Sequence, residues 1–370
     1  MNDFIPAFEW QRVMVEPWAE NLSTTFWIVL MGFLITAACG LIGNYLILRR
    51  MALVGDAISH SVLSGLAIAF LLSHSLNTLP MFIGALGAGI VTTVMIELIH
   101  KKTRVKQDSA IGITFSTLFA IGVILISFGQ TDAVDLDTEC VLYGEIAYVP
   151  LDLVKTELGP GAFSVMEKIP LLNSEIFLNE NLIDRSVSTA EEWLGFRRIV
   201  PMLNVGHPSV IRMAIVTSVT LLLILLFYKE LLVTSFDSGL SSSLGINSTV
   251  VHYALMGMLS VIIVSAFEAV GAILVIAMLI LPGATASLLA HRLPTMFGIT
   301  VVHALLSAVG GIHLATWLNC SPAGAMVVAG SALFALAWIF SPSQGLLLRW
   351  FGRELDELDE EEIERLVKGT

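Results

Sequence analysis

Long apolar segments separated by short polar ones dominate the chain, and this pattern predicts membrane-spanning helices. About 20 apolar residues in a helix cross the hydrocarbon core of a bilayer. Nine segments meet this criterion, at roughly 26–48, 52–73, 79–100, 109–128, 210–228, 249–267, 269–290, 295–317 and 322–340. The sixth and seventh are separated only by Glu268-Ala269. We therefore expect an all-α polytopic membrane protein with about nine transmembrane helices, and eight to ten are compatible with the pattern.

The composition agrees with a membrane protein. Of 370 residues, 56% are hydrophobic and 14% are charged, whereas soluble domains carry roughly a quarter charged residues. The first 20 residues contain several acids and no continuous apolar core, so we expect no cleavable signal peptide. A net charge of −12 without a basic patch argues against a nucleic-acid partner.

The basic residues of the short loops predict the orientation of the chain. If nine spans alternate, the clusters fall on one side, which the positive-inside rule makes cytoplasmic. These clusters are Arg49-Arg50, Lys101 to Lys106, Lys229, His291-Arg292, and Arg349 with Arg353. The N-terminus then lies outside and the C-terminus inside.

This orientation divides the chain into five parts. We expect an extracytoplasmic N-terminal segment (1–25), a first helix group (26–128), an extracytoplasmic insertion (129–209), a second helix group (210–342) and an acidic cytoplasmic tail (343–370). The insertion has too few apolar residues for a core of its own. We expect it to hold short helices, for example at 188–196, and to pack against the outer mouth. Whether Cys140 and Cys320 pair on that side stays open.

A polar sequence, Gly55-Asp56-Ala57-Ile58-Ser59-His60-Ser61, lies within the second span. Asp56 and His60 are four residues apart, which places them on the same face of a helix. Ionisable side chains are costly in a membrane and usually mark an ion or substrate path. A carboxylate and an imidazole also suit a divalent transition metal. The alternative is a buried pair that bonds neighbouring helices.

Other polar or special residues of the spans allow two interpretations each. Glu268 is an exposed turn residue if the two adjoining spans form a hairpin, and a candidate metal ligand if the helix continues inward. Pro282 removes a helical hydrogen bond, so it marks either a hinge or a static bend. His303 and His313 are expected to be packing or interfacial residues.

A short amphipathic helix is predicted on the cytoplasmic side, near 236–245. Phe236, Leu240 and Leu244 recur every four residues, Asp237 can cap the helix, and Gly245 can end it. A plain surface loop does not need such an apolar stripe. The segment suits a docking element for a soluble partner. The chain itself contains no P-loop for ATP and no His-Glu-x-x-His motif of a zinc protease.

At this point the chain resembles a known family, the membrane permease subunits of ATP-binding-cassette importers for zinc, manganese and iron. The resemblance covers roughly 22–145 and 205–342, and the Gly-Asp-Ala-x-Ser-His block is its most specific part. Its four stretches are Arg49 to His60, Val134-Asp135-Leu136 with Tyr143-Gly144, Phe227 to Gly245, and Ala269-Val270-Gly271 through Pro282 to Ala286. The loop between Gly144 and about Pro208 is longer than is usual in the family.

The resemblance implies a homodimer of permeases in a bacterial inner membrane, with two cytoplasmic ATP-binding subunits and an extracytoplasmic metal-binding protein. The permease is then not an enzyme, and a divalent ion (Zn²⁺, Mn²⁺ or Fe²⁺) is its cargo rather than a permanent cofactor. Asp56 and His60 would line the metal path. The coupling helix that receives the ATPase movement would contain Phe236, Asp237, Leu240, Leu244 and Gly245.

Two rival functions remain open on the sequence. A proton-coupled secondary metal transporter would use Asp56 and His60 as a proton relay and would need no ATPase. A membrane-embedded metalloenzyme would turn over an organic substrate by itself. The predicted coupling helix favours the ATP-driven importer.

Overall fold

The structure, a computed structural model, describes residues 6–74, 78–129, 146, 154–157, 178–179, 202–206, 208–341 and 345. Eight helices in this part of the chain are long and apolar enough to cross a membrane, and a shorter apolar helix covers Ile273–Leu289. The expected polytopic helical fold is therefore confirmed. The expected count of about nine corresponds to the eight long helices together with this shorter one.

The helices are named in chain order. They are η1 (Gln11–Val15, a π-helix), α1 (Glu16–Ala19), α2 (Leu22–Leu48), α3 (Leu53–Ser73), α4 (Thr78–Lys102), α5 (Gln107–Gly129), α9 (Pro208–Leu226), α10 (Tyr228–Phe236), α11 (Ser238–Ser243), α12 (Ser248–Leu289), α13 (Leu293–Leu318) and α14 (Pro322–Phe340).

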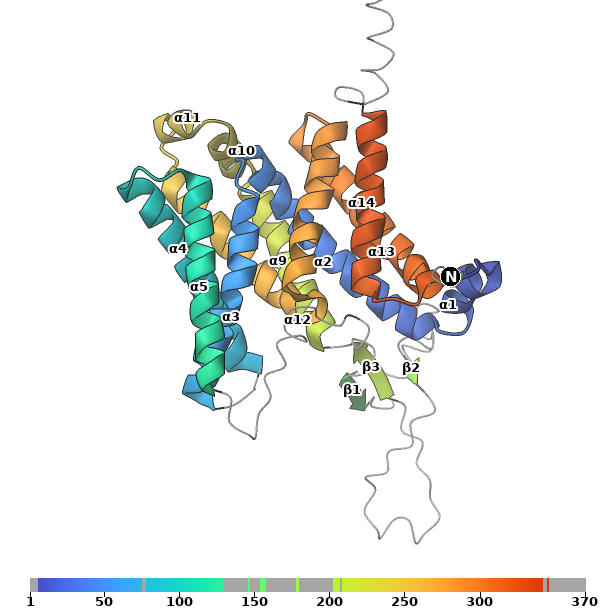
Figure 1. Cartoon of the computed structure of the whole chain (residues 1–370). Helices are drawn as coiled ribbons and strands as arrows, with labels where there is room; N and C mark the ends of the chain where they lie inside the picture. Colours follow the sequence, from blue (N-terminus) through green and yellow to red (C-terminus); the bar gives the residue numbers. More distant parts are fainter. Residues whose placement is uncertain are drawn as a thin grey trace, which may run out of the picture.

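The long helices form two groups joined through α12 (Figure 1). In one group α3 packs against α4 and α5, and in the other α2 packs against α9, α12 and α13. Helix α2 is the most enclosed of the spans, because 78% of its most apolar 18-residue stretch is buried. Met31, Ile35 and Ile42 on this helix are fully buried. A helix that is apolar on all sides belongs inside a bundle, and α2 is the centre of this one.

Helix α12 reverses direction at Gly271, where the backbone leaves the helical region with φ 78° and ψ 165°. Ile263 and Leu279, each eight residues from Gly271, both lie against Gly55 of α3. Two residues this far apart in one straight helix could not contact the same residue. The two halves of α12 therefore form a hairpin, which the sequence placed at Glu268-Ala269.

Among the described residues, the connections α2–α3, α4–α5 and α12–α13, which carry basic residues, lie at one end of the bundle, which we call the basic end (upper edge in Figure 1). Arg49 and Lys101 line one cavity there together with Gln107 and Ser248, the first residues of α5 and α12. Arg49 also bonds to Ser235 of α10. The grouping agrees with the orientation that the sequence predicts.

Part of the insertion forms a small antiparallel sheet in the order β1-β3-β2. The strands are β1 (Val154–Glu157), β2 (Leu178–Asn179) and β3 (Met202–Gly206), with Lys155 opposite Asn204 and Leu178 opposite Leu203. They lie at the end opposite the basic end (Figure 1). The expected helix at 188–196, Cys140 and the acidic tail are outside the described residues.

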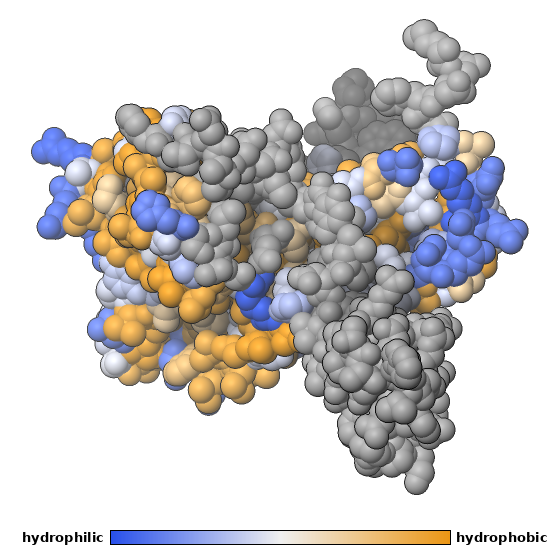
Figure 2. Space-filling model, turned by 90° about the horizontal axis from the view of Figure 1, so that it is seen from below, coloured by the Kyte–Doolittle hydropathy of each residue, from blue (hydrophilic) through white to orange (hydrophobic). Residues whose placement is uncertain are grey.

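Apolar side chains also cover the outside of the bundle. Seen from the end opposite the basic end, they dominate the half of the view where α3, α4 and α5 lie (Figure 2). On α4 alone, Leu79, Ile83 and Ile90 are exposed. A water-soluble protein rarely exposes so much contiguous apolar surface, so this flank is suited to lipid or to another membrane helix.

The hairpin in α12 generates a prediction about Gly271. Its φ and ψ fall in a region that is accessible essentially to glycine alone. We expect Gly271→Ala to destabilise the protein by about 1–3 kcal/mol, measured as a lower midpoint of thermal unfolding in detergent.

Gly257→Ala is the matched control, because Gly257 lies in the helical first half of α12 and a Cβ there meets no atom within 4 Å. It should be neutral or stabilising, since alanine favours a helix. Equal midpoints for the two variants would contradict a glycine-dependent reversal.

Candidate functional site

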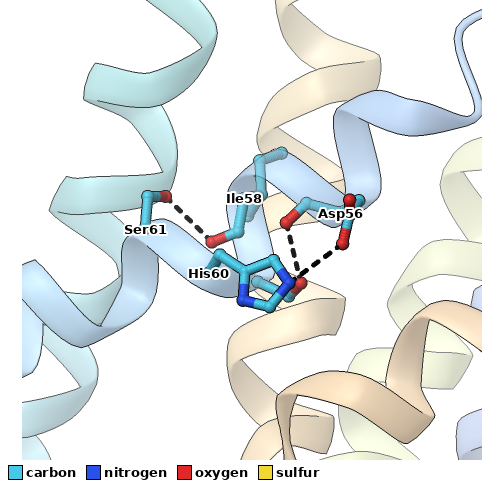
Figure 3. Close-up of polar contacts among 5 residues, drawn as sticks. Asp56, Ile58, His60 and Ser61 are labelled. Carbon is cyan, nitrogen blue, oxygen red and sulfur yellow. Dashed lines mark hydrogen bonds and ion pairs between the residues drawn. The ribbon is translucent and has the colours of Figure 1, made fainter. Parts of the chain in front are cut away.

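The Asp56–His60 pair lies near the first turn of α3, at the basic end. Nε2 of His60 is 3.2 Å from Oδ1 of Asp56, as the four-residue spacing predicts (Figure 3). The two side chains are partly exposed in the single chain, 26% for His60 and 31% for Asp56. The pair is thus formed within one helix turn and is still open to a further ligand.

The neighbouring serine hydroxyls form their hydrogen bonds elsewhere than with the side chains of Asp56 and His60. Ser59 donates its hydroxyl to the carbonyl oxygen of Asp56, and Ser61 donates to the carbonyl oxygen of Ile58 (Figure 3). Thr92 of α4 lies 2.5 Å from the Ser61 hydroxyl oxygen. The two serine hydroxyls therefore bond to the backbone and to α4, and not to the carboxylate of Asp56.

Two aromatic rings of α5 flank His60. The ring centroids of Phe115 and Phe119 lie 5.7 Å and 5.9 Å from that of the imidazole. They fix the imidazole from the side of α5 without offering it a ligand atom. Sequence reasoning did not identify them, although two phenylalanines four residues apart on the predicted span were a visible signal.

A close approach of α5 to α3 brings these rings to His60. A Cβ at Gly122 would lie 2.8 Å from the backbone nitrogen of Ser64, which is too close for any larger residue. Glycine at such contacts lets transmembrane helices pack backbone to backbone. Phe115 and Phe119 therefore reach His60 because residue 122, two turns after Phe115 on α5, is a glycine.

The single chain offers two ligand side chains at this place. Among the described residues, no group of three or more His, Cys, Asp or Glu side chains is close enough to hold a metal ion. Glu268, the third candidate ligand, lies three residues before the reversal of α12; its side chain is outside the described part. The two halves of α12 thus form a hairpin, and for a hairpin the sequence predicts that Glu268 is a turn residue and not a metal ligand.

The predicted amphipathic helix at 236–245 is divided at Asp237. Helix α10 ends at Phe236, Asp237 is extended, and α11 begins at Ser238. Oδ1 of Asp237 accepts hydrogen bonds from the backbone nitrogens of Gly239 and Leu240, at 2.8 and 3.0 Å. Gly245 has φ 77° just after α11. The sequence therefore placed both caps correctly and began the helix two residues early.

The apolar stripe of this segment faces outward. Phe236 is 66% exposed, Leu240 51% and Leu244 61%. Three large apolar side chains exposed at the basic end form an unpartnered surface in the single chain. Such a surface marks an interaction site.

Pro282 lies within the helical second half of α12, and the non-helical backbone is at Gly271 instead. Pro282 is buried against α2, where it contacts the position of a Cβ at Gly40. Gly271 is one of three glycines in 248–290, with Gly257 and Gly283, and hydropathy alone did not reveal which of them breaks the helix. The role of Pro282 as a hinge stays a prediction.

The two histidines of α13 have structural partners, as expected. Nε2 of His303 is 3.2 Å from the carbonyl oxygen of Gly330. Nδ1 of His313 is 2.8 Å from the carbonyl oxygen of Val13, and Trp18 donates to its Nε2. These contacts hold α14 and the N-terminal segment against α13.

Comparisons with known proteins show the family of the chain. A sequence model of the ABC 3 transport family matches residues 21–166 and 201–341. The manganese transport system membrane protein MntD of Bacillus subtilis is 39% identical over 331 residues, 89% of this chain and 96% of that protein. The zinc transport system membrane protein TroD of Treponema pallidum is 36% identical over 88% of this chain and 76% of its own.

A solved structure has the same fold. The structure of PsaBC from Streptococcus pneumoniae in complex with Fab matches with a TM-score of 0.64 and 26% identity. The match covers 91% of this chain and 98% of the other. The likeness thus extends over both helix groups.

Proposed function

Because the chain belongs to the ABC 3 transport family, we propose that it is the membrane permease subunit of an ATP-driven importer of divalent transition-metal ions. ATP hydrolysis is the work of separate subunits, since the chain has no P-loop. The ion is cargo that passes through the permease. The described relatives, named for manganese and for zinc transport, support this class of cargo.

The geometry of Asp56 and His60 is the observation that carries the proposal. Two N/O ligands, each about 2.0–2.2 Å from one ion at a tetrahedral angle, are roughly 3.3–3.6 Å apart. Nε2 of His60 and Oδ1 of Asp56 are 3.2 Å apart. An ion could therefore replace the direct contact with little movement, provided that Nε2 is unprotonated and the ring proton is on Nδ1.

A second copy of the permease would complete the coordination. One chain supplies one carboxylate and one imidazole, and both side chains are partly exposed. Two copies that face each other across this surface would supply two of each. Such a four-ligand set suits Zn²⁺, and Mn²⁺ would add water or carbonyl oxygens.

The basic end is cytoplasmic in this proposal, because short loops rich in lysine and arginine stay inside. Segments 1–25 and 129–209 then lie outside, where a metal-binding protein would deliver the ion, and the acidic tail lies inside. The exposed stripe of Phe236, Leu240 and Leu244 would be covered by the ATPase subunits. Movement of that stripe would open the site around Asp56 and His60 to the cytoplasm.

Removal of either ligand tests the proposed path. We expect Asp56→Asn and His60→Ala to lower ATP-dependent uptake of Mn²⁺ or Zn²⁺ by at least about tenfold, the scale on which even indirect metal partners act. The measurement is radiolabelled metal uptake by the assembled importer in proteoliposomes.

His74→Asn is the control, since His74 is an exposed left-handed residue just after the same helix, and asparagine tolerates that conformation. Its uptake should match the unmodified importer. Normal transport by both ligand variants at normal expression would reject the path. Uptake without any ATPase would instead favour a proton-coupled secondary transporter. Competition between Mn²⁺, Zn²⁺ and Fe²⁺ in the same assay identifies the cargo.

The cap of α11 gives a second prediction. Asp237→Ala removes the acceptor of two backbone N–H groups and should destabilise the helix by about 1 kcal/mol. If the ATPase subunits bind α11 in its helical form, their affinity for the permease falls by up to about fivefold. Titration of labelled permease in nanodiscs with purified ATPase subunits measures this change.

Asp237→Asn is the matched control, because asparagine caps a helix as well as aspartate does. It should bind the ATPase subunits with nearly unchanged affinity. An equal loss for both variants would mean that the charge of Asp237, and not the cap, matters. Unchanged affinity for Asp237→Ala would remove α11 from the interface.

A further inference from the structure

Arg49 connects two parts of the chain that are far apart in sequence. It follows the last residue of α2, and its guanidinium donates two hydrogen bonds to the last turn of α10. Nε donates to the hydroxyl of Ser235 at 3.0 Å, and Nη2 donates to the hydroxyl of Thr234 at 2.9 Å. Two donors on one edge of a planar group thus bind two adjacent hydroxyls, which a lysine ammonium cannot reproduce.

The two hydroxyls are oriented to receive Arg49. Thr234 donates its own proton to the carbonyl oxygen of Glu230 at 2.7 Å, and Ser235 donates to that of Leu231 at 2.6 Å. Each hydroxyl therefore presents lone pairs to the guanidinium. In the described residues no carboxylate lies within ion-pair distance of Arg49. The guanidinium is held to α10 by neutral acceptors, and burial lowers its pKa.

The other side of Arg49 leads directly to the candidate metal site. Residues 49–52 are the whole connection between α2 and α3, and its turn is closed by hydrogen bonds from Arg50 to Ile47 and from Met51 to Leu46. Arg50 has φ 57°, a conformation that is unfavourable for arginine. A short connection closed by hydrogen bonds leaves little slack between its ends, so a displacement of Arg49 would be passed to the first turn of α3, which contains Asp56.

We propose that Arg49 is a positioning residue that transmits movement of α10 and α11 to α3 and so couples ATP hydrolysis to metal release. The inference rests on the proposed function and adds the path by which the movement reaches the candidate metal site. Asp237 caps α11 directly after the residues that Arg49 holds. A displacement of the exposed stripe would thus reach Arg49 within one turn of α10 and reach the Asp56–His60 pair through the connector.

The test is the coupling ratio, the number of metal ions imported per ATP hydrolysed, measured on the complete importer in proteoliposomes. We expect Arg49→Ala to lower this ratio at least about tenfold, because two hydrogen bonds from a charged group are lost. ATP hydrolysis itself should continue. A variant that merely folds poorly would lower uptake and hydrolysis together and leave the ratio unchanged.

The acceptor side provides variants that keep Arg49. Thr234→Val with Ser235→Ala removes both hydroxyls and should lower the ratio as Arg49→Ala does. Thr234→Ser with Ser235→Thr keeps both hydroxyls in exchanged positions and should retain the normal ratio. A variant that combines Thr234→Val and Ser235→Ala with Arg49→Ala should have the same coupling ratio as Arg49→Ala alone, since both changes break the same contact.

Arg50→Gln is the charge control, because Arg50 is exposed and its side chain has no part in the contact to α10. Its ratio should be normal. A normal ratio in the Thr234→Val, Ser235→Ala variant would overturn the role of Arg49, whatever Arg49→Ala does. If the unmodified importer shows no ATP-dependent uptake, the proposed function fails instead, and this outcome is separate from the first.

Discussion

The central constraint on this structure is that α3, a helix long and apolar enough to cross a membrane, carries two ionisable side chains, Asp56 and His60. A carboxylate on a membrane-spanning helix is costly unless it has a partner, and Asp56 has His60 as its partner on the same helix. The hydroxyls of Ser59 and Ser61 donate to backbone carbonyl oxygens, and Thr92 of α4 donates to that of Ser61. The Asp56–His60 pair itself stays partly exposed, and the proposal of a passing cation and a facing second copy of the chain rests on this exposure.

Periodicity and hydropathy were sufficient for most of the helices, because a span is encoded by about 20 consecutive residues. They were imprecise by two or three residues where a single residue sets the geometry. The hydropathy of 249–290 is nearly continuous, and the reversal at Gly271 depends on a positive φ that no composition reveals. Likewise the four-residue stripe of Phe236, Leu240 and Leu244 suggested one helix, and the extended backbone of Asp237 divides it.

The candidate site was predictable to the extent that it is local. Asp56 and His60 meet because they are four residues apart on one helix. Their surroundings are long-range. Phe115 and Phe119 reach His60 only because Gly122 lets α5 approach α3. Arg49 was understood from the sequence as one of several cytoplasmic charges, and its contact with Thr234 and Ser235 joins residues separated by 185 and 186 positions.

The position of the pair along α3 limits how transport can work. From Leu53, a rise of 1.5 Å per residue puts Asp56 about 4.5 Å and His60 about 10.5 Å from the basic end. In the proposed function, an ion from outside would therefore pass along most of the length of α3 before it meets these ligands. Release to the cytoplasm would then need only a short movement at this end of α3, and the connector held by Arg49 is attached there.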